Sequence, residues 1–116
     1  QRQMCIRDRH WDSTKTDKGA FYMSVPNNAA YRTMEPVASN WESHNKLGSA
    51  LVGGLKQNGV KIFSSGSMEM DLTQTSYSTV PSIDIELGDG KSAHDDATLG
   101  RLADGLVVGV NSYFGQ

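Results

Sequence analysis

Short β-prone runs alternate along this chain with longer segments whose apolar residues recur at helical spacing. The clearest of these segments are the β-prone runs 19–25, 60–63 and 82–87 and the helical stripes at Leu47, Leu51 and Leu55 and over 99–114. Strands that alternate with helices favour an α/β layer fold with a largely parallel sheet. With 116 residues, 37% of them hydrophobic, the chain can form one domain at most. We therefore expect an α/β three-layer sandwich with a mostly parallel or mixed sheet flanked by helices.

The boundaries of these elements carry their own signals. Ser39 followed by Glu42 has the spacing of a capping box, which predicts the start of the first helix. The glycine pair at 53–54 weakens that helix and predicts close packing on a sheet. Asn-Gly at 58–59 is a helix stop, and residues 64–67 have the composition of a loop.

Composition excludes several classes of function. The net charge is −2, so the chain lacks the basic patch that nucleic-acid binding requires. No apolar run approaches the roughly 20 residues that a membrane-spanning helix needs. The single cysteine, Cys5, excludes a disulfide framework. The composition does not indicate an oligomeric state.

The first nine residues resemble a translated sequencing adapter. Residues 4–9 read Met-Cys-Ile-Arg-Asp-Arg, which matches the translation of a transposon end used to prepare sequencing libraries. We therefore predict that residues 1–9 are an artefact that packs poorly on the domain, and that native sequence begins near His10. On this interpretation the domain is truncated at its N-terminus, and upstream coding sequence has been lost.

Three apparent motifs have simpler explanations. Residues 90–92, Gly-Lys-Ser, resemble the end of a phosphate-binding loop, but Ile85 stands where that loop needs a glycine. His94 with the acidic pair 95–96 resembles a metal site, yet acidic residues at the start of a helix are favoured by its dipole. His44 lies in the first helix, and we expect it to be a solvated or edge histidine.

Two segments remain as candidates for a functional site. Residues 10–13 read His-Trp-Asp-Ser, and residues 81–88 read Pro-Ser-Ile-Asp-Ile-Glu-Leu-Gly. Glu86 ends an apolar strand before a glycine-rich turn, and ligands bind beyond the carboxyl ends of strands in open α/β sheets. A carboxylate there can act as a general base. An equally weighted alternative is a solvent-facing acid on an edge strand, with Asp84 on the same face.

Together these segments resemble the zinc-dependent N-acetylmuramoyl-L-alanine amidases of the family 3 type, which hydrolyse peptidoglycan. Similar motifs occur in the same order in residues 10–13, 19–23, 43–48, 81–88, 95–99 and 113–114. The resemblance covers residues 10–115, which would be the C-terminal part of one amidase catalytic domain (residues 10–116). Each motif alone is loose, and the specificity comes from their order and spacing.

The resemblance implies roles for two residues. His10 matches the second zinc-binding histidine of the family, and Glu86 matches the glutamate that activates the zinc-bound water. The bond cleaved would join N-acetylmuramic acid to L-alanine in peptidoglycan, at an extracytoplasmic place in the cell wall or periplasm. The remaining zinc ligands of the family lie upstream of the His10 motif, so we expect the chain as given to be inactive and its parent to be an amidase, either an autolysin or a phage lysin.

The sequence also departs from the family pattern. Asp84 stands where an aliphatic residue is usual, Trp11 where a small one is, and the turn 88–92 differs from the usual Gly-Phe-x-Ser-Asn. Two alternatives therefore stay open. One is a non-catalytic wall-binding or structural α/β domain, and the other is a different zinc peptidase, such as a carboxypeptidase.

Overall fold

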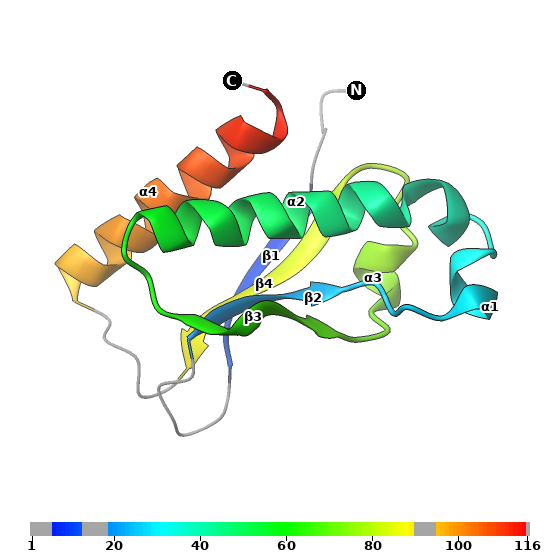
Figure 1. The fold of residues 1–116 in the computed structure, drawn as a ribbon, viewed down its shortest axis with the longest axis horizontal. Helices are drawn as coiled ribbons and strands as arrows, with labels where there is room; N and C mark the ends of the chain where they lie inside the picture. The colour runs from blue at the N-terminus through cyan, green and yellow to red at the C-terminus, as the bar shows by residue number, and fades with distance from the viewer. Residues whose placement is uncertain (1–5, 13–18, 90–94, 116) are drawn as a thin grey trace.

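The chain folds around a four-stranded mixed sheet. The computed structural model describes residues 6–12, 19–89 and 95–115, with the backbone alone for residues 6–12. The strands are β1 (Ile6–Asp12), β2 (Ala20–Ser24), β3 (Ile62–Glu69) and β4 (Ser82–Asp89). They lie in the order β1-β4-β2-β3, with β1 parallel to β4, β2 parallel to β3, and β2 antiparallel to β4 (Figure 1). The predicted α/β class with a mixed sheet is therefore confirmed.

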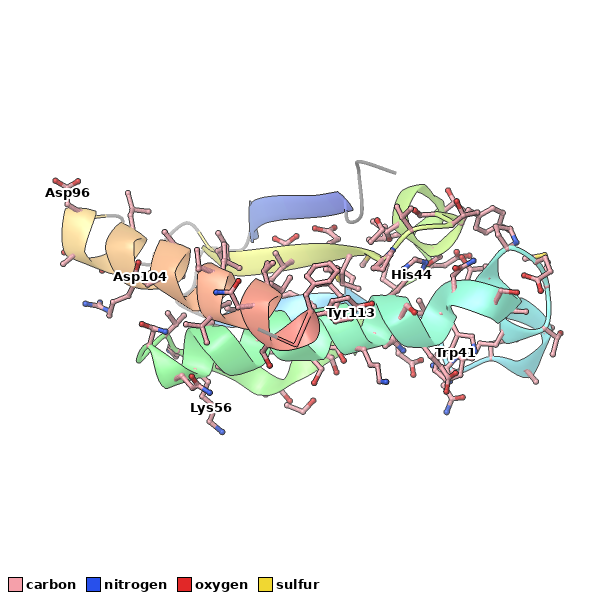
Figure 2. All side chains as sticks on the ribbon, turned by 90° about the horizontal axis from the view of Figure 1, so that it is seen from above. Trp41, His44, Lys56, Asp96, Asp104 and Tyr113 are labelled. Atoms are coloured by element: carbon pink, nitrogen blue, oxygen red, sulfur yellow. The ribbon has the colours of Figure 1, made fainter. Side chains whose placement is uncertain are left out.

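Two long helices lie together on one face of this sheet. The helices are α1 (Ala29–Arg32), α2 (Val37–Gln57), α3 (Thr73–Ser76) and α4 (Asp96–Tyr113). Figure 1 shows α2 and α4 above the sheet, and Figure 2 looks down onto them. None of the described helices combines the length and the apolar character that a bilayer crossing requires.

The hydrophobic core lies between the sheet and α2. Leu47, Leu51 and Leu55 of α2 are fully buried against Ile83 and Ile85 of β4. Full burial of such a side chain stabilises the fold by roughly 1.5–3 kcal/mol relative to its exposed state. The predicted leucine face of the first helix therefore forms the centre of the core.

The glycine pair at 53–54 acts differently from the prediction. A Cβ on Gly54 would collide with the carbonyl oxygen of Gly105 and the nitrogen of Gly109, whereas one on Gly53 would meet nothing. Gly54 therefore permits close packing of α2 on the helix α4 and not on the sheet. Gly105 and Gly109 provide the matching close approach on α4.

The helix α2 begins earlier than the capping box predicts. Its first residue is Val37, so Ser39 lies inside the helix. The carboxylate of Glu35 accepts hydrogen bonds from the Ser39 backbone N–H (3.1 Å) and hydroxyl (2.7 Å). The capping acid therefore precedes Ser39, and Glu42 does not close a box with it.

Strand β3 includes the segment predicted to be a loop. Its register against β2 shifts between Ala20 and Tyr22, so that Tyr22 pairs with Ser67. Ser64 and Gly66 have positive φ angles of 52° and 93°. A positive φ angle favours glycine, because glycine has no Cβ. The extra residues of β3 between Ile62 and Ser67 form a bulge at the edge of the sheet. The loop-like composition of residues 64–67 thus marks an irregularity inside an edge strand.

The N-terminal segment also departs from prediction where it is described. Residues 6–9 belong to β1 and pair with β4, so the expectation that residues 1–9 pack poorly on the domain is wrong for these four residues. Residues 1–5 lie outside the described part of the chain. Strand pairing uses backbone groups, which any sequence supplies, so it does not test the origin of these residues.

The predicted last helix is confirmed as α4, but part of its apolar stripe is exposed. Asp95 is its N-cap and accepts a hydrogen bond from the Thr98 N–H at 2.8 Å, as its position before the helix suggests. His94 lies outside the described residues. The apolar stripe divides between two sides of the helix, because Leu102 is buried while Val107 is 58% exposed.

Candidate active site

The strand that carries Glu86 is central in the sheet. β4 lies between β1 and β2, and the side chains of Asp84 and Glu86 are each only 7% exposed. The alternative interpretation of a solvent-facing acid on an edge strand is therefore wrong. Both acids are buried, which is rare for carboxylates that have no partner, and each of these two takes part in an interaction.

Side-chain alternation places Glu86 on the face of the sheet opposite the helices. Successive residues of a strand point to opposite faces. Ile83 and Ile85 belong to the core beneath α2, so Asp84 and Glu86 point to the other face. The two carboxylates therefore share one side of β4.

Glu86 has one backbone neighbour on each adjacent strand. In β1 its register partner is His10, and in β2 it is Phe21. Phe21 is 1% exposed, and its ring lies 5.3 Å from the ring of Phe63 at an interplanar angle of 54°. An apolar group next to a buried carboxylate strengthens the electrostatic interactions of that carboxylate, because little water screens them.

The pairing of His10 with Glu86 brings the two sequence-predicted site residues together. Both lie towards the carboxyl ends of parallel strands, and adjacent strands are spaced by about 4.8 Å. The predicted proximity of the two backbone positions is thus confirmed. The side chain of His10 lies outside the described part of the structure, so its role as a ligand stays a prediction.

The described side chains do not complete a zinc site. Catalytic zinc generally needs three protein ligands and an open position. No group of three or more histidine, cysteine, aspartate or glutamate side chains within the described residues is placed to hold a metal ion. The turn at 90–92 and His94 lie outside those residues. A complete zinc site would therefore need ligands other than the described side chains.

His44 is buried, contrary to the predicted solvated position. Its exposed fraction is 0%, and its Nδ1 accepts a hydrogen bond of 3.0 Å from the Ser82 N–H. Burial lowers the pKa of His44 below 6.5, and nearby backbone groups of Ser78 and Ser76 oppose this shift. A neutral imidazole therefore fastens α2 to the first residue of β4, four positions before Glu86.

The sequence-based predictions missed the burial of two residues, Phe21 beside Glu86 and His44 at the start of β4. Phe21 falls in a predicted strand, but its pairing with Glu86 depends on β2 running antiparallel beside β4. His44 lies three residues before Leu47, which is the spacing of one helical face, and this signal predicts burial.

No protein-family model matches the sequence, and no curated protein matches it either. Solved structures do resemble it. The N-acetylmuramyl-L-alanine amidase Ami1 from Mycobacterium smegmatis superposes with a TM-score of 0.76 at 17% identity, over 98% of this chain and 55% of that one. The apo form of Ami1 from Mycobacterium abscessus gives 0.66 at 19% identity, over 97% and 56%.

A third similar structure comes from another bacterium. The catalytic domain of CwlV, an N-acetylmuramoyl-L-alanine amidase from Bacillus (Paenibacillus) polymyxa var. colistinus, gives a TM-score of 0.58 at 16% identity, over 98% of this chain and 59% of that one. The chain thus spans just over half the length of each of these three proteins. At such low identities the likeness concerns the fold, and over its own span the chain shares the fold of these amidases.

Proposed function

We propose that this chain is part of a peptidoglycan hydrolase that cleaves the amide between N-acetylmuramic acid and L-alanine. The observation that carries the proposal is the register pairing of His10 with Glu86 at neighbouring parallel strands, in a chain with an amidase fold. A histidine that can bind a metal ion and a glutamate that can act as a base are therefore at adjacent backbone positions. The substrate would be peptidoglycan, which places the reaction outside the cytoplasmic membrane.

Glu86 is the proposed general base of this reaction. A buried carboxylate can take a proton from water and pass it to the leaving amine. Strands on both sides of β4 fix the backbone position of Glu86. This fixed geometry supports a catalytic role better than a mobile surface acid would.

Zinc is part of the proposal, with His10 as one of its ligands. A bound zinc ion would polarise the scissile carbonyl and lower the pKa of a bound water. Because the described residues do not complete its coordination, the proposal needs further ligands from outside them. The adapter origin of residues 1–9 and the inactivity of the chain alone also remain predictions.

The test uses a longer protein that contains this chain and covers the full length of the amidase domain. Glu86→Gln should lower the release of L-alanine-bearing peptides from purified peptidoglycan by about 10²- to 10⁴-fold, since general-base catalysis contributes that much. The zinc content, measured by atomic emission, should stay unchanged. His10→Ala should instead reduce the zinc content, and chelation should abolish activity.

Asp84→Asn is the matched control, because Asp84 lies on the same strand and the same face with the same exposure. Its activity should stay close to that of the wild type. Near-normal peptide release by a folded Glu86→Gln protein would refute the proposed mechanism. Release of free amino acids from peptides, with no cleavage at muramic acid, would indicate a different peptidase.

A further inference from the structure

An open groove runs along one flank of α2, away from Glu86. It has a volume of about 320 Å³ and is lined by Tyr22, Trp41, Glu42, Asn45, Lys46 and Ser49, which we call the Trp41 groove. Its volume lies at the lower end of the range for small-molecule sites. The sheet separates it from the face that carries Glu86, so the proposed active site does not include it.

The indole of Trp41 is held in place before any ligand arrives. The guanidinium carbon of Arg32 lies 3.7 Å from the centre of the indole ring. Arg32 is itself fixed, because it donates hydrogen bonds to the carbonyl oxygens of Pro26 (2.8 Å) and Val25 (2.9 Å). Trp41 lines the groove and Arg32 does not. A fixed aromatic surface loses little conformational entropy on binding.

The polar groups of the groove have unused hydrogen-bonding capacity. Asn45 Oδ1 accepts from the Val25 N–H at 2.8 Å, which fixes the amide and leaves its NH₂ group to donate. Within the described part of the chain, the side chains of Glu42, Lys46 and Ser49 have no hydrogen-bond or ion-pair partner. The groove thus offers one carboxylate acceptor and several donors beside two aromatic rings.

A second groove lies next to the first, on the other side of the exposed surface of α2. It has a volume of about 430 Å³ and is lined by Ser43, Lys46, Ala50, Ser112 and Tyr113, which we call the Tyr113 groove. Lys46 belongs to both grooves. Because a helix turns 100° per residue, Trp41 and Ala50 lie on opposite flanks of α2, with Lys46 between them. Figure 2 labels Trp41 on α2 and Tyr113 on the neighbouring helix α4.

We propose that the two grooves form a secondary binding surface for an oligosaccharide chain. The C–H faces of a pyranose ring fit against aromatic rings, and its hydroxyl groups need both donors and acceptors. The Trp41 groove supplies both kinds of contact, with Glu42 and Lys46 offering charges of opposite sign. A neutral sugar therefore fits the groove better than a strongly charged ligand. This inference holds whether or not the chain hydrolyses peptidoglycan.

Binding is tested on the isotopically labelled 116-residue chain by NMR. The probes are chitotetraose, which carries N-acetyl groups as peptidoglycan glycans do, and cellotetraose, which has none. The indole N–H of Trp41 should shift and saturate with at least one probe, whereas the backbone N–H of Lys56, which lines neither groove, should not. Preference for chitotetraose would support a wall-glycan ligand, and preference for cellotetraose a plain glucan. No saturable shift with either would overturn the proposal.

Two lysines of α2 provide a matched pair of variants. Lys46 lines both grooves and Lys56 lines neither, although both are lysines on the same helix. Lys46→Ala should raise the Kd about threefold or more, as expected for the loss of one charge-assisted hydrogen bond, while Lys56→Ala should leave it unchanged. Equal effects of the two changes would overturn the proposal. Trp41→Ala should raise the Kd about tenfold and Trp41→Phe by less, but the lysine pair decides the matter if Trp41→Ala does not fold.

The length of the sugar chain tests the link between the grooves. A tetrasaccharide can span a helix about 10 Å wide, whereas a disaccharide fills one groove. Tyr113→Ala should therefore weaken the binding of a tetrasaccharide and leave that of the disaccharide at the Trp41 groove unchanged. A Tyr113→Ala protein that binds both lengths as the wild type does would overturn the two-groove surface. Because these experiments measure binding and not cleavage, their failure is distinguishable from failure of the proposed hydrolase function.

Discussion

At the scale of single residues, His44 shows how one buried polar side chain determines where a strand begins. Its Nδ1 accepts the N–H of Ser82, so this nitrogen must be unprotonated in the folded state. A protonated imidazole would place two donors against each other and would also bury a charge. The hydrogen bond therefore couples the position of β4 to the protonation state of His44.

We predict that this coupling makes the fold less stable in mild acid. Because burial lowers the pKa of His44 in the folded state, the unfolded chain binds its proton first. Stability is then unaffected above the unfolded pKa of about 6.5 and decreases as the pH falls below it, by at most about 1.4 kcal/mol per pH unit until the folded pKa is reached. Urea unfolding at pH 7.5 and at pH 5.5 measures this difference.

The control variants separate the contribution of His44 from that of His94. His44→Leu should remove most of the pH dependence, and at pH 7.5 it should cost about 1–3 kcal/mol because the Ser82 N–H loses its acceptor. His94→Gln, which alters the histidine that precedes α4, should retain the pH dependence. A His44→Leu protein with the wild-type dependence would show that other groups are responsible.

At the scale of elements, the contact between α2 and α4 depends on glycines that face each other. Gly54, Gly105 and Gly109 leave no room for a Cβ at the point where the helices meet. Because these glycines have no side chains, the two helix backbones can approach closely. Glycine also lowers the stability of a helix relative to alanine. Gly53 carries the same intrinsic cost without making such a contact.

Adjacent alanine substitutions in α2 should therefore have opposite effects. Gly53→Ala should stabilise the protein by about 0.5–1 kcal/mol, because its Cβ would enter open space and alanine favours the helix. Gly54→Ala should destabilise it by about 1–3 kcal/mol, because the helices must move apart. Chemical denaturation measures the free energy of unfolding of both variants. Helix propensity contributes equally to the two values, so their difference reports the packing of the added methyl group. Stabilisation by Gly54→Ala would mean that α4 does not pack as described.

At the scale of the whole molecule, the position of each strand in the sheet determines how its backbone is protected. β4 is hydrogen-bonded to strands on both sides, whereas β3 is an edge strand with an irregular register. Amides that open only with global unfolding lie in such central strands, and edges open locally at lower cost.

Hydrogen exchange should consequently be much slower over residues 83–86 than over residues 63–66. Exchange followed by NMR or mass spectrometry at neutral pH measures both segments in one experiment, and the core residues Leu47 to Leu55 of α2 serve as the internal reference. Protection of residues 63–66 equal to that of residues 83–86 would contradict the strand order.

The sequence alone determined the two long helices, the central strand β4 and the residue types of the candidate site. The leucines of α2, the alternation in β4 and the acidic start of α4 are local patterns, and each correctly predicted its element. Such patterns succeed because helical and extended periodicities follow from backbone geometry. The adjacency of His10 and Glu86 was predicted from a family resemblance and not from these patterns.

The tertiary structure alone decided which face and which neighbour each element acquired. Nothing local distinguishes an edge strand from a central one, so the burial of Asp84 and Glu86 depended on β1 and β2 pairing on either side of β4. The role of Gly54 likewise depended on glycines of α4, a helix distant along the chain. Such contacts join residues that are far apart in sequence, and their energies depend on the packing of both partners rather than on the pattern of either one.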